Sequence, residues 1–227
     1  MHQDPQTNEA QWTAVDAYIT GRLIRPDDVF RAVLAANAAA GLPAIDVSPL
    51  QGQFLHLIAR IAAARRILEI GTLGGYSTIW LARAIPADGI VVTLEENHSH
   101  AAVARANFAR AGLASRIDLR EGPALDTLPS LEADGIGPFD LIFIDADKEH
   151  NPDYLSWAMR LGRSGSVIIG DNVVREGTIL TAENADPTVS GVRRFLDLLA
   201  DEPRLSATAI QTVGSKGWDG FALAVLG

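Results

Sequence analysis

Residues 66–77 read RILEIGTLGGYS, and this stretch decides the fold. The mostly apolar run 66–70 is typical of a buried strand, and three glycines follow it within a short loop. The pattern of residues 76–84 then predicts a helix. A strand, a glycine loop and a helix in this order place backbone amides at a helix N-terminus, where anionic groups bind. Taken alone, such glycines can also do no more than shape a turn.

The same alternation of strand and helix continues along the chain. Short apolar runs predict seven strands at residues 66–70, 90–94, 117–120, 139–144, 166–170, 207–213 and 221–226. Helical patterns cover residues 76–84, 99–111, 124–133, 151–161 and 188–200. This order predicts an α/β fold in which helices cover both faces of a mostly parallel, doubly wound sheet. The last two strands are joined by 214–220 without a helix, which predicts a C-terminal antiparallel hairpin.

Three helices are expected before the first strand, at residues 9–19, 26–40 and 49–63. Asp27 and Asp28 are expected in the first turn of the second helix, where their charges favour the helix dipole. We expect one domain over residues 1–227. In it, residues 1–63 form a helical cap at one end of the sheet and residues 64–227 form the α/β core.

Composition excludes several classes of function. The chain has 227 residues, a formal net charge of −9 and no cysteine. Acidic proteins without a basic patch are poor candidates for nucleic-acid binding. Without cysteine, a metal site must use oxygen or imidazole ligands. The polar N-terminus and the lack of an apolar run of membrane-spanning length predict a cytoplasmic protein that does not insert into membranes.

Glu95 ends the second predicted strand, beside the glycine loop. An acidic residue at this place in an open α/β sheet can accept hydrogen bonds from ribose hydroxyls. The loop departs from the Gly-x-Gly-x-x-Gly pattern because Thr72 and Leu73 follow Gly71. These residues therefore predict a nucleoside ligand, and they leave open whether it is S-adenosylmethionine or NAD.

Acidic residues follow two further strands. Asp145, Asp147 and Lys148 follow the fourth strand, and Asp171 and Asn172 follow the fifth. Each group by itself is explained by the capping of helices and turns. Together, at the ligand-binding edge, two carboxylates and an amide oxygen favour a site for Mg²⁺, with Mn²⁺ and Ca²⁺ as alternatives. An octahedral ion held this way keeps positions for a bidentate substrate and a water.

A single lysine or histidine predicts a functional site less strongly than the acidic motifs do. A lysine near a strand end is ordinarily a surface residue that pairs with a neighbouring carboxylate, so Lys148 gains significance only from the motif around it. The five histidines are scattered along the chain. We expect structural or exposed roles for His2, His56, His98, His100 and His150.

In combination, these motifs resemble the cation-dependent class I O-methyltransferases, which include catechol and caffeoyl-CoA O-methyltransferases and bacterial relatives. The resemblance covers residues 47–227. Its carriers are the motifs at residues 69–71, 75–77, 95, 120–125, 145–148 and 171–172, with a further match at 52–55.

The resemblance implies a role for each matching position. It places a divalent metal on Asp145, Asp171 and Asn172, and it makes Lys148 the general base. It also implies a cofactor site for S-adenosylmethionine at Val47, Glu69, Gly71, Leu73, Gly75, Ser77, Glu95, Ala124, Asp145 and Asp147. The implied fold is a Rossmann-like seven-stranded sheet. The implied enzyme is a homodimer that methylates a small aromatic molecule with two neighbouring hydroxyls.

Two alternatives compete with this interpretation. An NAD-dependent oxidoreductase would explain the glycine loop and Glu95, but it leaves the two acidic strand ends unexplained. A non-catalytic cofactor-binding module is disfavoured because Lys148 and all three predicted metal ligands are present. One departure affects the acceptor: the carboxylate that catechol enzymes place on a later loop has no evident counterpart, so the sequence does not name the acceptor.

Overall fold

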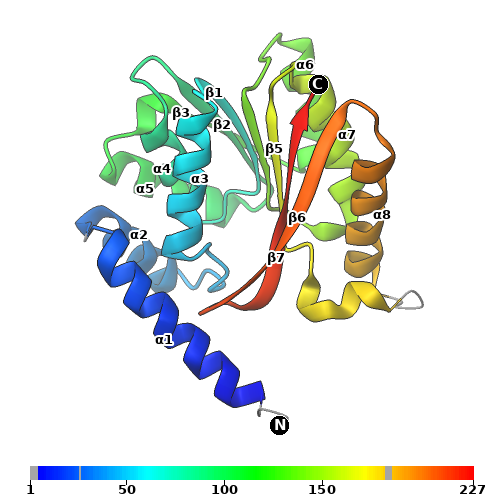
Figure 1. The fold of residues 1–227 in the computed structure, drawn as a ribbon. Helices are drawn as coiled ribbons and strands as arrows, with labels where there is room; N and C mark the ends of the chain where they lie inside the picture. The colour runs from blue at the N-terminus through cyan, green and yellow to red at the C-terminus, as the bar shows by residue number, and fades with distance from the viewer. Residues whose placement is uncertain (1–4, 26, 182–185) are drawn as a thin grey trace.

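The seven strands form one sheet in the order β3-β2-β1-β4-β5-β7-β6, in a computed structural model that describes residues 5–25, 27–181 and 186–227 (Figure 1). Their bounds are β1 (Arg66–Ile70), β2 (Ile90–Glu95), β3 (Ile117–Glu121), β4 (Leu141–Ile144), β5 (Val167–Asp171), β6 (Leu205–Gly214) and β7 (Gly217–Leu226). The first five strands pair in parallel, and β7 runs antiparallel to both β5 and β6. This arrangement confirms the predicted fold class.

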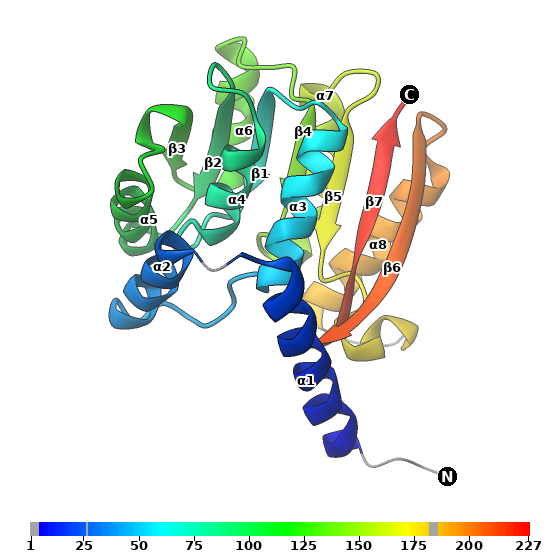
Figure 2. The same ribbon diagram turned by 60° about the vertical axis from the view of Figure 1, so that its left-hand side comes forward.

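Helices cover both faces of the sheet (Figures 1 and 2). Their bounds are α1 (Pro5–Leu23), α2 (Asp28–Ala39), α3 (Pro49–Ile61), α4 (Tyr76–Ala84), α5 (His98–Arg110), α6 (Ala124–Ala133), α7 (Asn151–Leu161) and α8 (Pro187–Asp201). Three short 3₁₀ helices, which the sequence did not predict, are η1 (Ala114–Arg116), η2 (Lys148–His150) and η3 (Arg175–Leu180). None of the helices in the described part of the chain is long and apolar enough to cross a membrane.

The core has two layers because successive strand residues point to opposite faces. Ile67 packs with residues of α3, α4 and α5, whereas its neighbour Leu68 packs with residues of α6, α7 and α8. Both side chains are fully buried. Burial on both faces explains why the central strands read as continuous apolar runs.

Two of the three N-terminal helices, α2 and α3, pack in the same core layer. Leu55 and Ala59 of α3 lie in the same core layer as Ile67, so α3 belongs to the helical layer on one face of the sheet. By contrast, α1 extends away from the body of the molecule and contacts the β6 end (Figure 2). Asp27 is the N-cap of α2, not a first-turn residue, because its side chain accepts the backbone N–H of Val29 at 2.8 Å. Residue 26, the predicted start of this helix, lies outside the described residues.

The C-terminal hairpin is longer and tighter than predicted. Strands β6 and β7 pair down to Gly214 and Gly217, so the turn contains only Ser215 and Lys216. The glycines and polar residues of this region resemble a loop in sequence. In the structure the two strands also pair through side chains, since Trp218 Nε1 donates to Gln211 Oε1 at 3.1 Å.

The order of the strands reverses between β1 and β4, which are parallel neighbours in the sheet. From β1 the chain proceeds to β2 and β3 on one side, and from β4 it proceeds to β5 and the hairpin on the other. Loops at the carboxyl ends of β1 and β4 therefore separate and leave a crevice, the usual ligand site of such sheets.

Candidate active site

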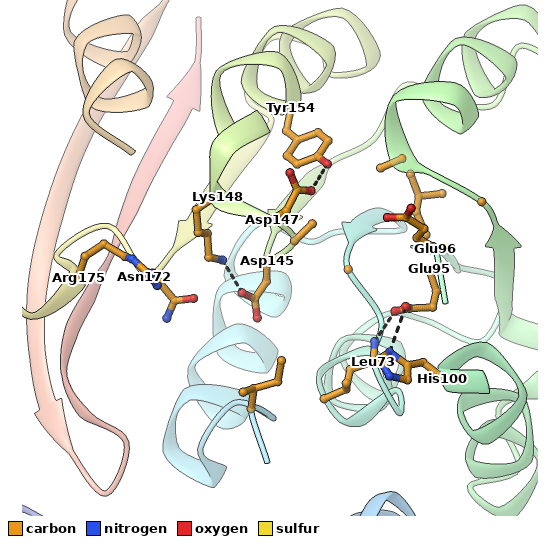
Figure 3. Close-up of a pocket in the computed structure, with 16 residues that line it drawn as sticks. Leu73, Glu95, Glu96, His100, Asp145, Asp147, Lys148, Tyr154, Asn172 and Arg175 are labelled. Atoms are coloured by element: carbon orange, nitrogen blue, oxygen red, sulfur yellow. Dashed lines mark hydrogen bonds and ion pairs between the residues drawn. The ribbon is translucent and has the colours of Figure 1, made fainter. Parts of the chain in front are cut away.

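A cavity of about 470 Å³ lies in this crevice, at the carboxyl ends of β1, β2, β4 and β5 (Figure 3). Eight residues predicted from the sequence line it, namely Gly71, Leu73, Glu95, Ala124, Asp145, Asp147, Lys148 and Asn172. Both halves of the predicted site, the nucleoside end and the acidic strand ends, therefore face one space.

Gly71 is where the two halves meet. Its φ angle is +100°, and a Cβ atom added there would lie 2.2 Å from the backbone oxygen of Asp145. No larger residue fits without moving the backbone, because both the conformation and the space require glycine. The end of β1 thus approaches the end of β4 closely enough to put the glycine loop beside Asp145.

Glu95 supports the glycine loop from β2. Its Oε2 atom accepts the backbone N–H of Leu73 at 2.8 Å and that of Thr72 at 3.3 Å. Its Oε1 atom lies 3.3 Å from Nδ1 of His100, which also lines the cavity (Figure 3). His100, for which a structural or exposed role was expected, is thus brought by α5 to the nucleoside end, where it pairs with Glu95.

Glu69 lies behind the loop and does not line the cavity. It is fully buried, and its carboxylate accepts hydrogen bonds from the hydroxyls of Ser77, Thr78 and Thr93. Burial raises the pKa of Glu69 to about 7 against these hydrogen bonds, and the charge of Asp145 acts in the same direction as burial. This carboxyl group ties β1 to β2 and α4.

Four of the predicted cofactor residues stand outside the cavity lining: Val47, Glu69, Gly75 and Ser77. Val47 is buried in the core, and Gly75 caps α4 with a φ of +82° while packing against Phe108. Direct contact of these residues with a cofactor stays a prediction.

Lys148 and Asp145 form a close pair at the end of β4. The Nζ atom of Lys148 donates to Oδ1 of Asp145 at 2.7 Å (Figure 3). The pair forms because η2 starts at Lys148, three residues after Asp145. The side chain of Lys148 is only 9% exposed. Asp147 points elsewhere and accepts hydrogen bonds from Tyr154 and His150, which outweigh its burial and lower its pKa.

Asp171 and Asn172 end β5 beside this pair. Asp171 accepts the backbone N–H of Asn172 at 2.9 Å and the side-chain amide of Gln51 at 2.6 Å. Burial, and next the charge of Asp145, raise the pKa of Asp171 to about 7. Asp171 lines an adjoining cavity of about 320 Å³ between α3 and the hairpin, and Asn172 lines both cavities.

These residues fit a hard divalent cation by their donor chemistry. Burial, and next the charge of Asp145, disfavour the ionised form of Asp171, so a positive charge beside the two carboxylates is electrostatically favoured. No hydrogen bond within the described residues uses the side-chain amide of Asn172, whose φ is +57°. No cluster of three or more histidine, aspartate or glutamate side chains that could hold a metal occurs in the described chain. The candidate donor set is two carboxylates and an amide.

Several residues that line the cavity were not predicted from the sequence to belong to the site. They are Ile45, Leu94, Glu96, His100, Gly122, Ala146, Tyr154 and Arg175. Gly122 and Ala146 lie inside the motifs at residues 120–125 and 145–148, and Glu96 follows the predicted residue Glu95. His100, Tyr154 and Arg175 reach the cavity from α5, α7 and η3, and no spacing in the sequence signals their approach.

Comparisons with known proteins agree with this geometry. A family model described as O-methyltransferase matches residues 27–224. A catechol O-methyltransferase of Mycobacterium tuberculosis is 55% identical over 226 residues and covers 100% of both chains. A catechol O-methyltransferase of Niastella koreensis is 49% identical over 219 residues, covering 96% of this chain and 99% of its own.

A solved structure agrees equally well. The crystal structure of an O-methyltransferase from Bacillus cereus in complex with SAH superposes with a TM-score of 0.95 at 58% identity, covering 96% of this chain and 99% of the other. The oxidoreductase alternative has no counterpart in these matches. A family model that spans most of the chain, relatives that match it end to end and the shared fold lead to one conclusion: the chain belongs to the O-methyltransferase family.

Proposed function

We propose that this O-methyltransferase transfers the methyl group of S-adenosylmethionine to one hydroxyl of a vicinal diphenol and requires a divalent cation, Mg²⁺ in the first place. The observation that carries the proposal is the shared cavity. The glycine loop and Glu95 lie at one end of it, and Asp145, Lys148 and Asn172 lie at the other. The SAH complex of the Bacillus cereus relative and the two catechol O-methyltransferases support the same donor and acceptor classes.

At the nucleoside end, Glu95 would accept hydrogen bonds from the ribose hydroxyls. Its carboxylate is oriented by the backbone amides of Leu73 and Thr72, so its position is set before the ligand arrives. His100 lies beside it, and Ala124 lines the same cavity. When bound, S-adenosylmethionine would supply a methyl group on a positively charged sulfonium, from which the neutral thioether is a good leaving group.

At the acceptor end, Asp145, Asp171 and Asn172 would hold the cation. When bound, it supplies positive charge that favours the ionised form of a hydroxyl next to it. Their two carboxylates and one amide oxygen match the preference of Mg²⁺ for oxygen ligands. A vicinal diphenol fits such a site because its two neighbouring oxygens can occupy adjacent positions.

Lys148 would act as the general base. It would accept the proton that the acceptor hydroxyl loses as the new oxygen–carbon bond forms and the carbon–sulfur bond breaks. Its side chain is almost fully buried and lines the cavity, so the amine is held near the acceptor oxygen and away from bulk water.

We further propose that the enzyme works as a homodimer in the cytoplasm, on a small-molecule acceptor and not on nucleic acid. Val15, Tyr18 and Leu23 of α1 are exposed by 50%, 65% and 71%, an apolar surface that a second copy would cover. Sedimentation equilibrium at micromolar concentration should return twice the chain mass of 24.2 kDa. A species of single-chain mass would contradict the dimer.

A methyl-transfer assay over a panel of phenols tests the function. Labelled S-adenosylmethionine is mixed with catechol, phenol and resorcinol, with and without a chelator. We expect transfer to catechol alone, loss of transfer with chelator and recovery on addition of Mg²⁺. A full rate on catechol after chelation would overturn the metal requirement, and transfer to phenol at the catechol rate would overturn the vicinal-diphenol acceptor. Calorimetric titration should also show binding of S-adenosylhomocysteine and not of NAD.

A further inference from the structure

Arg175 lines the acceptor end of the cavity and has no part in the function proposed above. It opens η3, three residues after Asn172, and its side chain lies on the same side of the cavity as that of Asn172 (Figure 3). Lys148, the other cation there, is already paired with Asp145. Among the described cavity residues, Arg175 is therefore the cation that is left to bind an anionic ligand.

The guanidinium is poorly satisfied. Its Nη2 atom donates to the hydroxyl of Thr188 at 3.3 Å, and its Nε atom is buried with no hydrogen-bond partner within the described residues. No carboxylate among the described residues lies within 4.0 Å of the Arg175 guanidinium, the limit for an ion pair. The hydroxyl and backbone of Thr188 and, to a smaller extent, the charge of Arg175 lower the pKa of Asp186, an exposed carboxylate at the start of α8. The Nη1 atom makes no hydrogen bond within the described residues either and, unlike Nε, is not fully buried, so a ligand in the cavity can accept from the guanidinium at its terminal nitrogens.

The backbone holds Arg175 in this place at the expense of strain. Arg175 and Glu176 have φ angles of +54° and +53°, and Asn172 has +57°. Left-handed backbone at three non-glycine residues persists only where the surroundings impose it. At Arg175 the backbone is held by Asp219 of β7, whose Oδ1 atom accepts the backbone N–H of Val174 at 2.9 Å and that of Arg175 at 3.0 Å.

We propose that Arg175 binds a carboxylate on the acceptor, so that the preferred acceptors are vicinal diphenols that carry an acid group on the same ring. This inference rests on the proposed function, because it places the two hydroxyls at Asp145 and Asn172 and the acid at Arg175. The planar guanidinium offers parallel N–H donors that match the two oxygens of a carboxylate. A neutral ring or a cationic amine would leave those donors unused.

A matched pair of ligands tests the proposal. The acid 3,4-dihydroxybenzoate and its neutral amide, 3,4-dihydroxybenzamide, have the same two hydroxyls and nearly the same shape. Each is titrated by calorimetry into the full-length enzyme with S-adenosylhomocysteine and Mg²⁺, and kcat/KM is measured for each with S-adenosylmethionine. The proteins are the wild type, Arg175→Gln, Arg175→Lys and the control Arg194→Gln. Arg194 is exposed on α8 and lines none of the cavities described.

The wild type and Arg194→Gln should prefer the acid by about tenfold or more in both measurements, the usual gain from hydrogen bonds to a charged group. In Arg175→Gln the two ligands should become equivalent within about twofold, and Arg175→Lys should fall between. Because the readout is a ratio within one protein, a general loss of activity in a variant does not affect it.

Two results would overturn the proposal. One is a wild type without preference for the acid, and the other is an Arg175→Gln variant that retains the wild-type ratio. If that variant also binds S-adenosylhomocysteine about tenfold more weakly, the guanidinium is assigned to the methionine carboxylate instead. If both ligands bind but neither is methylated, the proposed function fails, while the binding ratio still decides the role of Arg175.

Discussion

The Nζ atom of Lys148 lies 2.7 Å from Oδ1 of Asp145, so one hydrogen bond joins the candidate base to a candidate metal ligand. The charges of these two residues act in opposite directions on a third: beyond the effect of burial, Asp145 raises and Lys148 lowers the pKa of Asp171. The base and the metal ligands thus form one electrostatic group, and a change in any member alters the others.

Replacing Lys148 with methionine should lower kcat by about 10²–10⁴, the usual range for general-base catalysis. Methionine keeps the buried volume but cannot accept a proton. The loss should shrink with nitro-substituted catechols, because more acidic hydroxyls ionise without help. Steady-state rates over a series of substituted catechols, with single-turnover rates to isolate methyl transfer, measure this.

Binding of S-adenosylhomocysteine to the Lys148→Met variant serves as the control and should stay nearly unchanged. If the variant is equally slow on acidic and ordinary catechols while methyl transfer limits the rate, Lys148 positions the acceptor and does not take its proton.

Replacing Asp171 with asparagine should weaken Mg²⁺ binding by at least about tenfold, because one of two anionic ligands loses its charge. Activity should then require correspondingly more Mg²⁺. S-adenosylhomocysteine should bind as before, since Asp171 does not line the nucleoside end. Calorimetric titrations with each ligand separate the two effects. Asp118→Asn, on β3 and paired with Arg120, is the charge-matched control; equal Mg²⁺ affinity in both variants would remove Asp171 from the metal site.

Replacing Glu95 with alanine should weaken the binding of S-adenosylhomocysteine by about 1–3 kcal/mol, the value of hydrogen bonds to a charged group. The same change removes the acceptor for the amides of Leu73 and Thr72, so part of the loss will come from the loop. Calorimetry gives the affinity and circular dichroism verifies folding. Glu132→Ala, on the surface of α6 and paired with Arg160, should bind normally. A folded Glu95→Ala variant with wild-type affinity would refute the assignment.

Glu69 should make the cation-free protein less stable as pH rises. Its pKa is about 7 in the folded protein and lies at the ordinary value of 4.5 when unfolded, so the folded state holds the extra proton between these values. Stability contributed this way is present below about pH 4.5 and falls until about pH 7, by roughly 3 kcal/mol. Glutamine at this position stays neutral and removes the dependence.

Urea unfolding of the wild type and Glu69→Gln at pH 5 and pH 8, with chelator present, checks this. The stability of the variant relative to the wild type should be higher at pH 8 than at pH 5. Other titrating groups cancel in that difference. An identical difference at both pH values would show that Glu69 is not the group responsible.

Much of the fold and half of the site follow from the sequence through simple geometry. Parallel strands end at one edge, so residues that follow β4 and β5, such as Asp145 and Asn172, must share that edge. The same rule brings Glu95 to the glycine loop. These positions depend only on strand order and on side chains within a few residues of a strand end.

The remainder depends on contacts that no local pattern encodes. Arg175 reaches the cavity because Asp219, 44 positions away, holds its backbone amide. The orientation of α5 places His100 in the cavity lining. The hairpin turn is short because β6 and β7 pair as far as Gly214 and Gly217, although the composition there is typical of a loop. Asp27 resembles a dipole-stabilising charge in sequence, and only the backbone geometry identifies it as a cap.

The close approach of Gly71 to the Asp145 carbonyl has a consequence for how such an enzyme diversifies. In the function proposed above, the ribose hydroxyls are bound at the ends of β1 and β2 and the acceptor at the ends of β4 and β5, and Gly71 lies where β1 and β4 pair side by side. Substitutions at residues 173–181 or in the hairpin should therefore change which acceptor is methylated without rebuilding the donor half. In directed evolution toward new aromatic acceptors, those two segments are the ones to randomise, and Gly71 should be kept.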